Sequence, residues 1–138
     1  MGAARDVVDQ FYKHFGAGDM SGATQLFAAD CITVSPAGSM DTAEHEAFAN
    51  SFKAAMPDGR MEIVRAVESG DEIYVSGRLK GTHENDLVGA EGVIPASGNA
   101  VDLPYADYFK VKDGLIVEHE VVWDQFGLMA QLGVMPQV

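Results

Sequence analysis

Two ionisable side chains stand in otherwise apolar rows near the C-terminal end of the chain. Residues 100–111 and 115–123 each alternate between apolar and polar side chains. Asp107 shares its parity with Val101, Leu103, Tyr105, Phe109 and Val111. His119 shares its parity with Leu115, Val117, Val121 and Trp123. Because alternate side chains of a strand point to opposite faces, a polar residue on an apolar face must find a partner or line a cavity.

The turn Lys112-Asp113-Gly114 predicts that these two strands are antiparallel neighbours. Asp107 then lies opposite about position 120, which makes His119 and Val121 its neighbours. A buried carboxylic acid can donate a hydrogen bond to a developing oxyanion when protonated, or remove a proton when ionised. An Asp–His pair can equally be a structural contact. The sequence therefore predicts that Asp107 and His119 touch, and leaves open whether they react.

Three aromatic residues are candidates for shaping a pocket around this pair. Tyr105 and Trp123 share the apolar faces of Asp107 and His119, and Tyr12 lies on the apolar side of the first predicted helix. Each could equally be an ordinary core residue whose polar atom finds one partner.

The remaining histidines give weaker signals. His83 ends the inward row of residues 72–83, where it could orient a ligand or lie in solvent beside a loop. His14 and His45 are on predicted helices and are expected at the surface.

The first half of the chain predicts helices. Apolar residues recur at helical spacing over residues 3–15, and Asp19 can cap a short helix over residues 21–28. Residues 31–35 alternate as a short strand that stops at Pro36. Asp41 and Glu44 resemble a capping box that opens a third helix, which ends at Pro57-Asp58-Gly59.

From residue 60 the apolar period changes from helical to two. Strands are predicted over 60–68, 72–83, 100–111 and 115–123, followed by a short helix over 125–132. The Gly-rich residues 84–99 are longer than a hairpin needs and are expected to cover one end of the sheet as a lid. Helices followed by hairpins predict a single α+β domain over residues 1–138.

Composition limits the partners. The 138 residues carry a formal net charge of -12, which repels phosphate backbones and anionic lipids, so neither nucleic acid nor a membrane is expected to bind. The N-terminus lacks a signal peptide and Cys31 is the only cysteine, so the cytoplasm is the expected location. No zinc spacing, phosphate loop or nucleophile elbow is present, so no metal or cofactor is predicted.

Several segments resemble the SnoaL-like polyketide cyclases of the nuclear transport factor 2-like superfamily. They are "DCITVSP", "AAMPDGRMEI", "GTHENDLVG" and, most specifically, "DYFKVKDGLIVEH" followed by "WDQFGLMAQLG". The resemblance covers nearly the whole chain. It implies a cone-shaped α+β fold, a pocket for a small, largely apolar molecule, and a homodimer formed through the sheet. Fold alone fixes no reaction, since the superfamily includes cyclases, isomerases, hydrolases and dehydratases.

The resemblance also assigns positions, with departures. Asp107 matches the acid that ketosteroid isomerase keeps protonated in its oxyanion hole, and Trp123 matches a pocket tryptophan of that enzyme. The catalytic Asp of the cyclases, however, falls on Val121. The isomerase base is replaced by Ser35, and its first-helix tyrosine falls on Phe11, with Tyr12 beside it. This sequence therefore lacks part of the catalytic set of the cyclases and part of that of ketosteroid isomerase.

Three hypotheses follow. The first is an enzyme that performs cofactor-free acid/base chemistry, such as cyclisation, isomerisation or hydration, on an apolar carbonyl compound. Asp107 and His119 would react, while Tyr105, Trp123, His83, Tyr12 and Val121 would contact the substrate. The second is a non-catalytic binding module that has lost the acid at Val121. The third is an assembly domain that works through its outer sheet face.

Overall fold

The computed structural model describes residues 3–89 and 92–134. Its elements follow in the order α1 (Ala3–Gly16), α2 (Met20–Thr24), β1 (Thr33–Ser35), β2 (Gly38–Met40), α3 (Thr42–Ala55), β3 (Arg60–Ser69), β4 (Glu72–Thr82), β5 (Leu87–Gly89), β6 (Gly92–Ile94), β7 (Ala100–Lys112), β8 (Leu115–Trp123) and α4 (Gln125–Gln131). The large sheet has the order β2-β1-β8-β7-β4-β3. All its pairings are antiparallel except that of β1 with β8. The predicted α+β fold is confirmed.

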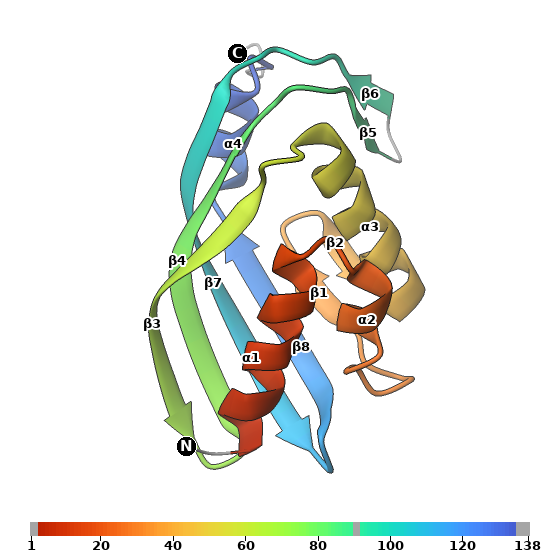
Figure 1. Cartoon of the computed structure of the whole chain (residues 1–138), viewed down its shortest axis with the longest axis vertical. Helices are drawn as coiled ribbons and strands as arrows, with labels where there is room; N and C mark the ends of the chain where they lie inside the picture. The colour runs from red at the N-terminus through yellow and green to blue at the C-terminus, as the bar shows by residue number, and fades with distance from the viewer. Residues whose placement is uncertain (1–2, 90–91, 135–138) are drawn as a thin grey trace.

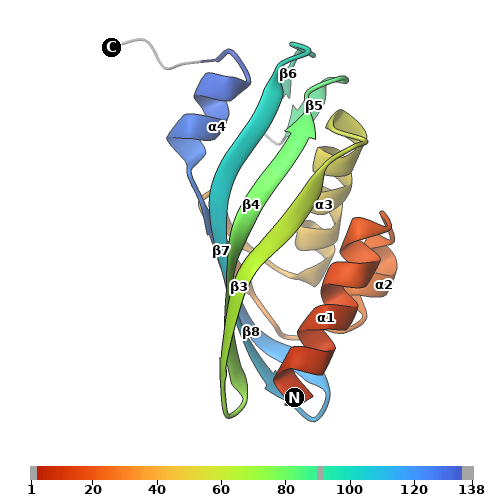
Figure 2. The same cartoon turned by 60° about the vertical axis from the view of Figure 1, so that its left-hand side comes forward.

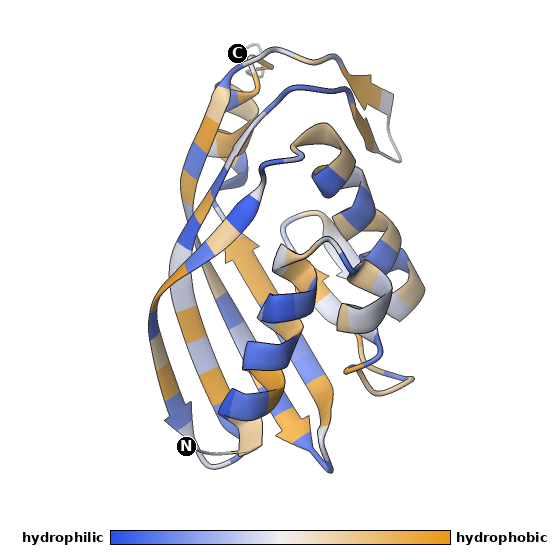
Figure 3. Cartoon of the chain, in the orientation of Figure 1, coloured by the Kyte–Doolittle hydropathy of each residue, from blue (hydrophilic) through white to orange (hydrophobic). Residues whose placement is uncertain are grey.

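The sheet is curved, and α1, α2 and α3 lie on one side of it (Figures 1 and 2). Its long strands carry alternating apolar and polar residues, visible as alternating bands in Figure 3. The inward residues of β4 and β7, such as Ile73 and Phe109, are completely buried against Val8 and Phe11 of α1. The core therefore lies between the concave face of the sheet and the helices.

The helix boundaries follow local capping signals. Asp41 accepts a hydrogen bond from the backbone N–H of Glu44, and the Glu44 carboxylate accepts one from the N–H of Asp41, so the predicted capping box is present. Asp19 caps α2 through the N–H of Gly22, as expected. That helix ends at Thr24, earlier than predicted, because Phe27 instead forms a parallel bridge with Ile116.

Two features of the sheet differ from the sequence pattern. Strand β2, which forms a hairpin with β1 around Pro36, was not predicted. In β8, the pairing shifts between Lys110 and Val111 of the neighbouring β7, which leaves Val117 as an extra residue. On the N-terminal side of this bulge, the residues of β8 that face the core have the opposite parity to those after it. Ile116 is therefore buried and Leu115 is 38% exposed. The predicted inward placement of Leu115 was therefore wrong, whereas His119, on the C-terminal side of the bulge, faces the core as predicted.

Residues 84–99 contain the small hairpin of β5 and β6, apart from the large sheet. The hairpin extends beyond the ends of β4 and β7 and lies next to α3 (Figure 1). Its described residues do not line the main cavity. The segment thus covers one end of the sheet, as expected, without closing over the candidate site.

No helix in the described part of the chain is long and apolar enough to cross a membrane.

Candidate active site

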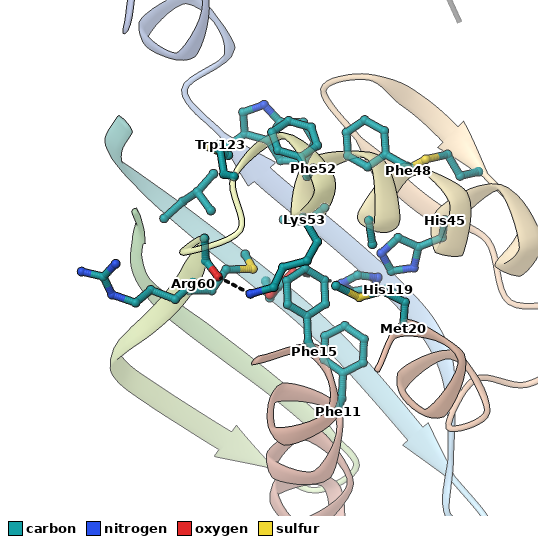
Figure 4. A pocket seen from close by; sticks show the side chains of 18 residues that line it. Phe11, Phe15, Met20, His45, Phe48, Phe52, Lys53, Arg60, His119 and Trp123 are labelled. Carbon is teal, nitrogen blue, oxygen red and sulfur yellow. Dashed lines mark hydrogen bonds and ion pairs between the residues drawn. The ribbon is translucent and has the colours of Figure 1, made fainter. Parts of the chain in front are cut away.

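A cavity of about 90 Å³ lies between the helices and the concave face of the sheet (Figure 4). One water needs about 10–15 Å³ by the same measure, so the cavity has room for several waters or part of an organic molecule. Its wall is largely apolar and includes Phe11, Phe15, Met20, Met40, Phe48, Phe52, Met56, Met61, Leu79, Val121 and Trp123. The ionisable side chains that line it are His45, Lys53, Arg60, Asp107 and His119. An apolar wall with a few polar groups is typical of a small-molecule site.

Asp107 and His119 contact each other, as the strand pairing predicted. Asp107 lies opposite Val121, and His119 lies opposite Phe109, so the two are diagonal neighbours on one face. His119 Nε2 is 2.9 Å from Asp107 Oδ1, and Asp107 and His119 are only 2% and 4% exposed, respectively. The His119 ring stacks on Phe109 with 4.6 Å between ring centres. The pair is therefore fixed, shielded from water, and in the cavity wall.

Two tyrosines hold the other oxygen of Asp107. The Tyr12 hydroxyl lies 2.5 Å from Asp107 Oδ2 and 3.0 Å from the Tyr105 hydroxyl. Tyr12 has a single proton and an ionised carboxylate can only accept, so Tyr12 donates to Asp107 and Tyr105 donates to Tyr12. Burial, together with the nearby Asp107 charge, raises the pKa of Tyr12 far above its ordinary value and that of Tyr105 to about 12. Both hydroxyls therefore stay protonated at neutral pH.

Thr33 and His45 extend the chain of hydrogen bonds beyond His119. Thr33 of β1 lies beside His119 in the parallel pairing, and its Oγ1 is 2.9 Å from His119 Nδ1 and 3.4 Å from His45 Nδ1. His45 comes from α3 and is 7% exposed, so its predicted surface position was wrong. Burial, and to a lesser extent His119, lowers the pKa of His45 to about 4. His45 is therefore neutral at pH 7.

One arrangement of protons satisfies all these contacts. With His45 protonated on Nδ1, it donates to Thr33, Thr33 donates to His119 Nδ1, and His119 Nε2 donates to Asp107. The carboxylate of Asp107 then accepts from His119 on one oxygen and from Tyr12 on the other. Hydrogen bonds to a charged group are the stronger kind, so they offset much of the cost of burying the carboxylate.

The other predicted site residues divide into two groups. Val121 and Trp123 line the cavity, and Trp123 stacks on Phe48 with 5.8 Å between ring centres. Tyr12, Tyr105 and His83 do not line it. Tyr12 contacts Asp107 directly and Tyr105 contacts Tyr12, on the side of Asp107 away from the cavity. His83 is completely buried rather than solvated, and its Nδ1 is 2.9 Å from Ser97 Oγ. Substrate contact by these three residues stays a prediction that this geometry does not favour.

Sequence reasoning missed Thr33, His45 and Lys53. Thr33 lies between two apolar residues, Ile32 and Val34. Their apolar character suggests that they face the core and that Thr33 faces solvent. In the structure, however, Ile32 and Val34 are 47% and 45% exposed and Thr33 is buried. His45 follows the capping box by one residue, and its burial depends on how α3 is rotated against the sheet. No group of three or more His, Cys, Asp or Glu side chains that could hold a metal ion occurs among the described residues.

The lowered pKa of His45 predicts an acid-dependent loss of stability. Between pH 6.5 and about 4, the unfolded chain binds a proton at this residue and the folded chain does not, so the free energy of unfolding falls as the pH falls. A difference of this size corresponds to roughly 3 kcal/mol. Replacing His45 by Gln should remove this contribution while keeping a polar partner for Thr33. Urea unfolding of both proteins at pH 7 and pH 4 measures it, and parallel pH curves would contradict it.

Together, the fold and site define a pocket protein of the α+β class with a hydrogen-bonded Asp–His pair in a largely apolar cavity. The sequence model of the SnoaL-like polyketide cyclases matches residues 6–132. The chain belongs to this family. No curated protein matches it significantly.

Solved structures show the same fold. A putative hydroxylase, AclR from Streptomyces galilaeus, superposes with a TM-score of 0.83 at 20% identity, covering 96% of this chain and 97% of that one. IdmH, a putative polyketide cyclase from Streptomyces antibioticus, has a TM-score of 0.79 at 25% identity and covers 95% and 99%. A putative SnoaL-like polyketide cyclase from Jannaschia has a TM-score of 0.83 at 17% identity and covers 97% and 94%. The expected nuclear transport factor 2-like fold is confirmed.

Proposed function

We propose that the protein is an enzyme that performs cofactor-free acid/base chemistry on an apolar carbonyl compound. The observation that carries this proposal is the Asp107–His119 pair, which is joined by a 2.9 Å contact and lines a largely apolar cavity. Ionisable side chains within hydrogen-bond distance of each other in such a cavity are typical of catalytic sites. Cyclisation, isomerisation and hydration of a carbonyl compound all require a proton to be moved at the reacting atoms.

Asp107 is the proposed base. It would remove a proton from carbon next to the substrate carbonyl, and Tyr12 and His119 would hold the carboxylate in position through its two oxygens. The proton gained would stay on a carboxylate oxygen of Asp107, because His119 Nε2 already carries the proton that it donates to this group. Return of the proton to a different atom would complete an isomerisation or the final step of a cyclisation.

Solvent exchange tests this proposal without knowledge of the natural substrate. In heavy water, a base acting next to a carbonyl replaces the adjacent C–H hydrogens of a ketone with deuterium. A bicyclic aromatic ketone such as 2-tetralone carries an apolar body and such hydrogens. We expect the protein to accelerate this exchange, as followed by proton NMR, above the rate given by an equal concentration of serum albumin. An unchanged rate over a panel of such ketones would contradict catalysis.

The second candidate is a binding module that has kept the cavity and lost the reaction. It is favoured by Val121, an apolar residue where related cyclases carry their catalytic Asp. In that case the ketones should bind, as reported by the fluorescence of the single tryptophan, Trp123, in the cavity wall, but should not exchange. The third hypothesis, a purely structural domain, has less support because the protein's own side chains leave the cavity open.

We also propose that the chain forms a homodimer through the outer face of its sheet. Exposed apolar side chains gather there from four strands, namely Val34, Val67, Tyr74 and Val122. An apolar face of this kind is typical of an interaction surface. The expected cytoplasmic location stays a prediction.

A charged substitution tests this interface. The wild-type protein should have the mass of two 14.7 kDa chains by light scattering, and Val122→Glu should shift it toward one chain, because a carboxylate buried in an apolar interface is unfavourable. Val88→Glu is the matched control, since Val88 is 57% exposed on β5, away from the large sheet. Equal masses for wild type and Val122→Glu would contradict the proposal.

A further inference from the structure

Lys53 places a positive charge in the wall of the cavity. It lies in the last turn of α3, and its side chain extends across the space between α3, Phe15 and Arg60 (Figure 4). Among the residues that the structure describes, the ammonium group of Lys53 forms one hydrogen bond, a 3.2 Å contact to the carbonyl oxygen of Gly59. An ammonium group has three N–H donors, so two of them are left for another partner.

No carboxylate neutralises this charge within the described part of the chain. The other cation in the cavity wall, Arg60, is bound to Glu62 at 2.8 Å. Lys53 forms no ion pair with residues 3–89 or 92–134, although acidic residues outnumber basic ones by 21 to 9 in the whole chain. An unpaired lysine at a cavity in so acidic a protein can bind an anionic group supplied from outside.

We propose that Lys53 binds a carboxylate on an otherwise apolar substrate. This inference rests on the proposed function, because it adds a second polar contact to the same cavity. The carboxylate would pair with Lys53, the hydrocarbon body would lie against the phenylalanines, and the reacting carbonyl would face Asp107 and His119. The protein's net charge of -12 disfavours anions at long range, but salt screens that field beyond about 8–10 Å, so the local cation decides.

The alternative role of Lys53 is structural. Its bond to Gly59 joins the end of α3 to the turn before β3, and a cation in the last turn of a helix is favourable in itself. In that role, removal of the charge would lower the stability of the fold and affect every ligand equally. A matched pair of probes separates the two roles.

The probes are 4-cyclohexylbutanoate and its neutral primary amide, which differ only in the head group. Calorimetry and Trp123 fluorescence measure their dissociation constants for wild type, Lys53→Met, Lys53→Arg and Lys13→Met. Lys13 is an exposed lysine of α1 outside the cavity wall and serves as the control. A charge-assisted contact is expected to give wild type about a tenfold preference for the carboxylate.

Lys53→Met should lose this preference while binding the amide as wild type does, and Lys53→Arg and Lys13→Met should keep it. The inference is overturned if wild type binds the amide without preferring the carboxylate, or if Lys53→Met keeps the preference. It is also overturned if Lys53→Met weakens both probes equally, which indicates the structural role. Failure of wild type to bind either probe would instead count against the cavity as a ligand site, and so against the proposed function as well.

Discussion

Asp107→Asn should lower the rate of ketone deuterium exchange by about 10²- to 10⁴-fold, the usual contribution of a positioned general base. Asn has nearly the same shape as Asp but cannot take up the substrate proton. The amide can still accept a hydrogen bond from Tyr12 or His119, so the chain should stay folded.

The measurement is the exchange rate by NMR, with ketone binding followed in parallel through Trp123 fluorescence. If Asp107→Asn binds the ketone within a few-fold of the wild-type affinity but no longer accelerates deuterium exchange, the reaction is assigned to Asp107. Arg65→Gln is a suitable control, because Arg65 is an exposed residue of β3 outside the cavity wall. Wild-type exchange by Asp107→Asn would remove the residue from the proposed mechanism.

His119→Phe should lower the free energy of unfolding at pH 7 by roughly 3–5 kcal/mol. The phenyl ring keeps the stacking on Phe109 and the edge-on contacts with Phe11 and Phe27, so the loss comes mainly from hydrogen bonds. Asp107 Oδ1 and Thr33 Oγ1 both lose their 2.9 Å partner. A buried carboxylate left with fewer donors is the main source of the penalty.

Urea unfolding gives the value, and two further variants test the cause. Tyr108→Phe removes the 2.6 Å bond between Tyr108 and Glu72 on the outer face and should cost no more than about 1 kcal/mol, because that bond is exposed. Adding Asp107→Leu to His119→Phe should recover part of the loss, since an apolar pair leaves no unpaired charge. A double variant less stable than His119→Phe would show that packing, rather than the unpaired carboxylate, dominates.

Local pattern was sufficient to predict most elements. The change of apolar period from helical to two separates α1 and α3 from the four long strands, and the turn at Asp113-Gly114 fixes β7 and β8 as neighbours. Asp113 and Gly114 have φ values of 54° and 78°, as a tight hairpin turn of this kind requires. These signals lie within a few residues of one another, so the contact of Asp107 with His119 could be inferred from sequence.

The rest of the site depends on segments far apart in the sequence. Thr33 reaches His119 only because β1 joins the sheet in parallel beside β8, and no turn connects those two strands. His45 reaches Thr33 only through the rotation of α3 over the sheet, and Lys53 enters the cavity from the same helix. The bulge at Val117 decides which residues of β8 face inward.

The sequence by itself thus determined the class of fold, the strand neighbours and the contact of Asp107 with His119, because periodicity and turn chemistry act locally. Only the tertiary structure decided that Tyr12 and Tyr105 stand behind Asp107, that Thr33 and His45 continue the hydrogen bonds from His119, and that His83 lies outside the cavity wall. Those contacts arise from packing between distant segments. Burial and hydrogen-bond satisfaction of the whole chain select that packing, and no short pattern encodes it.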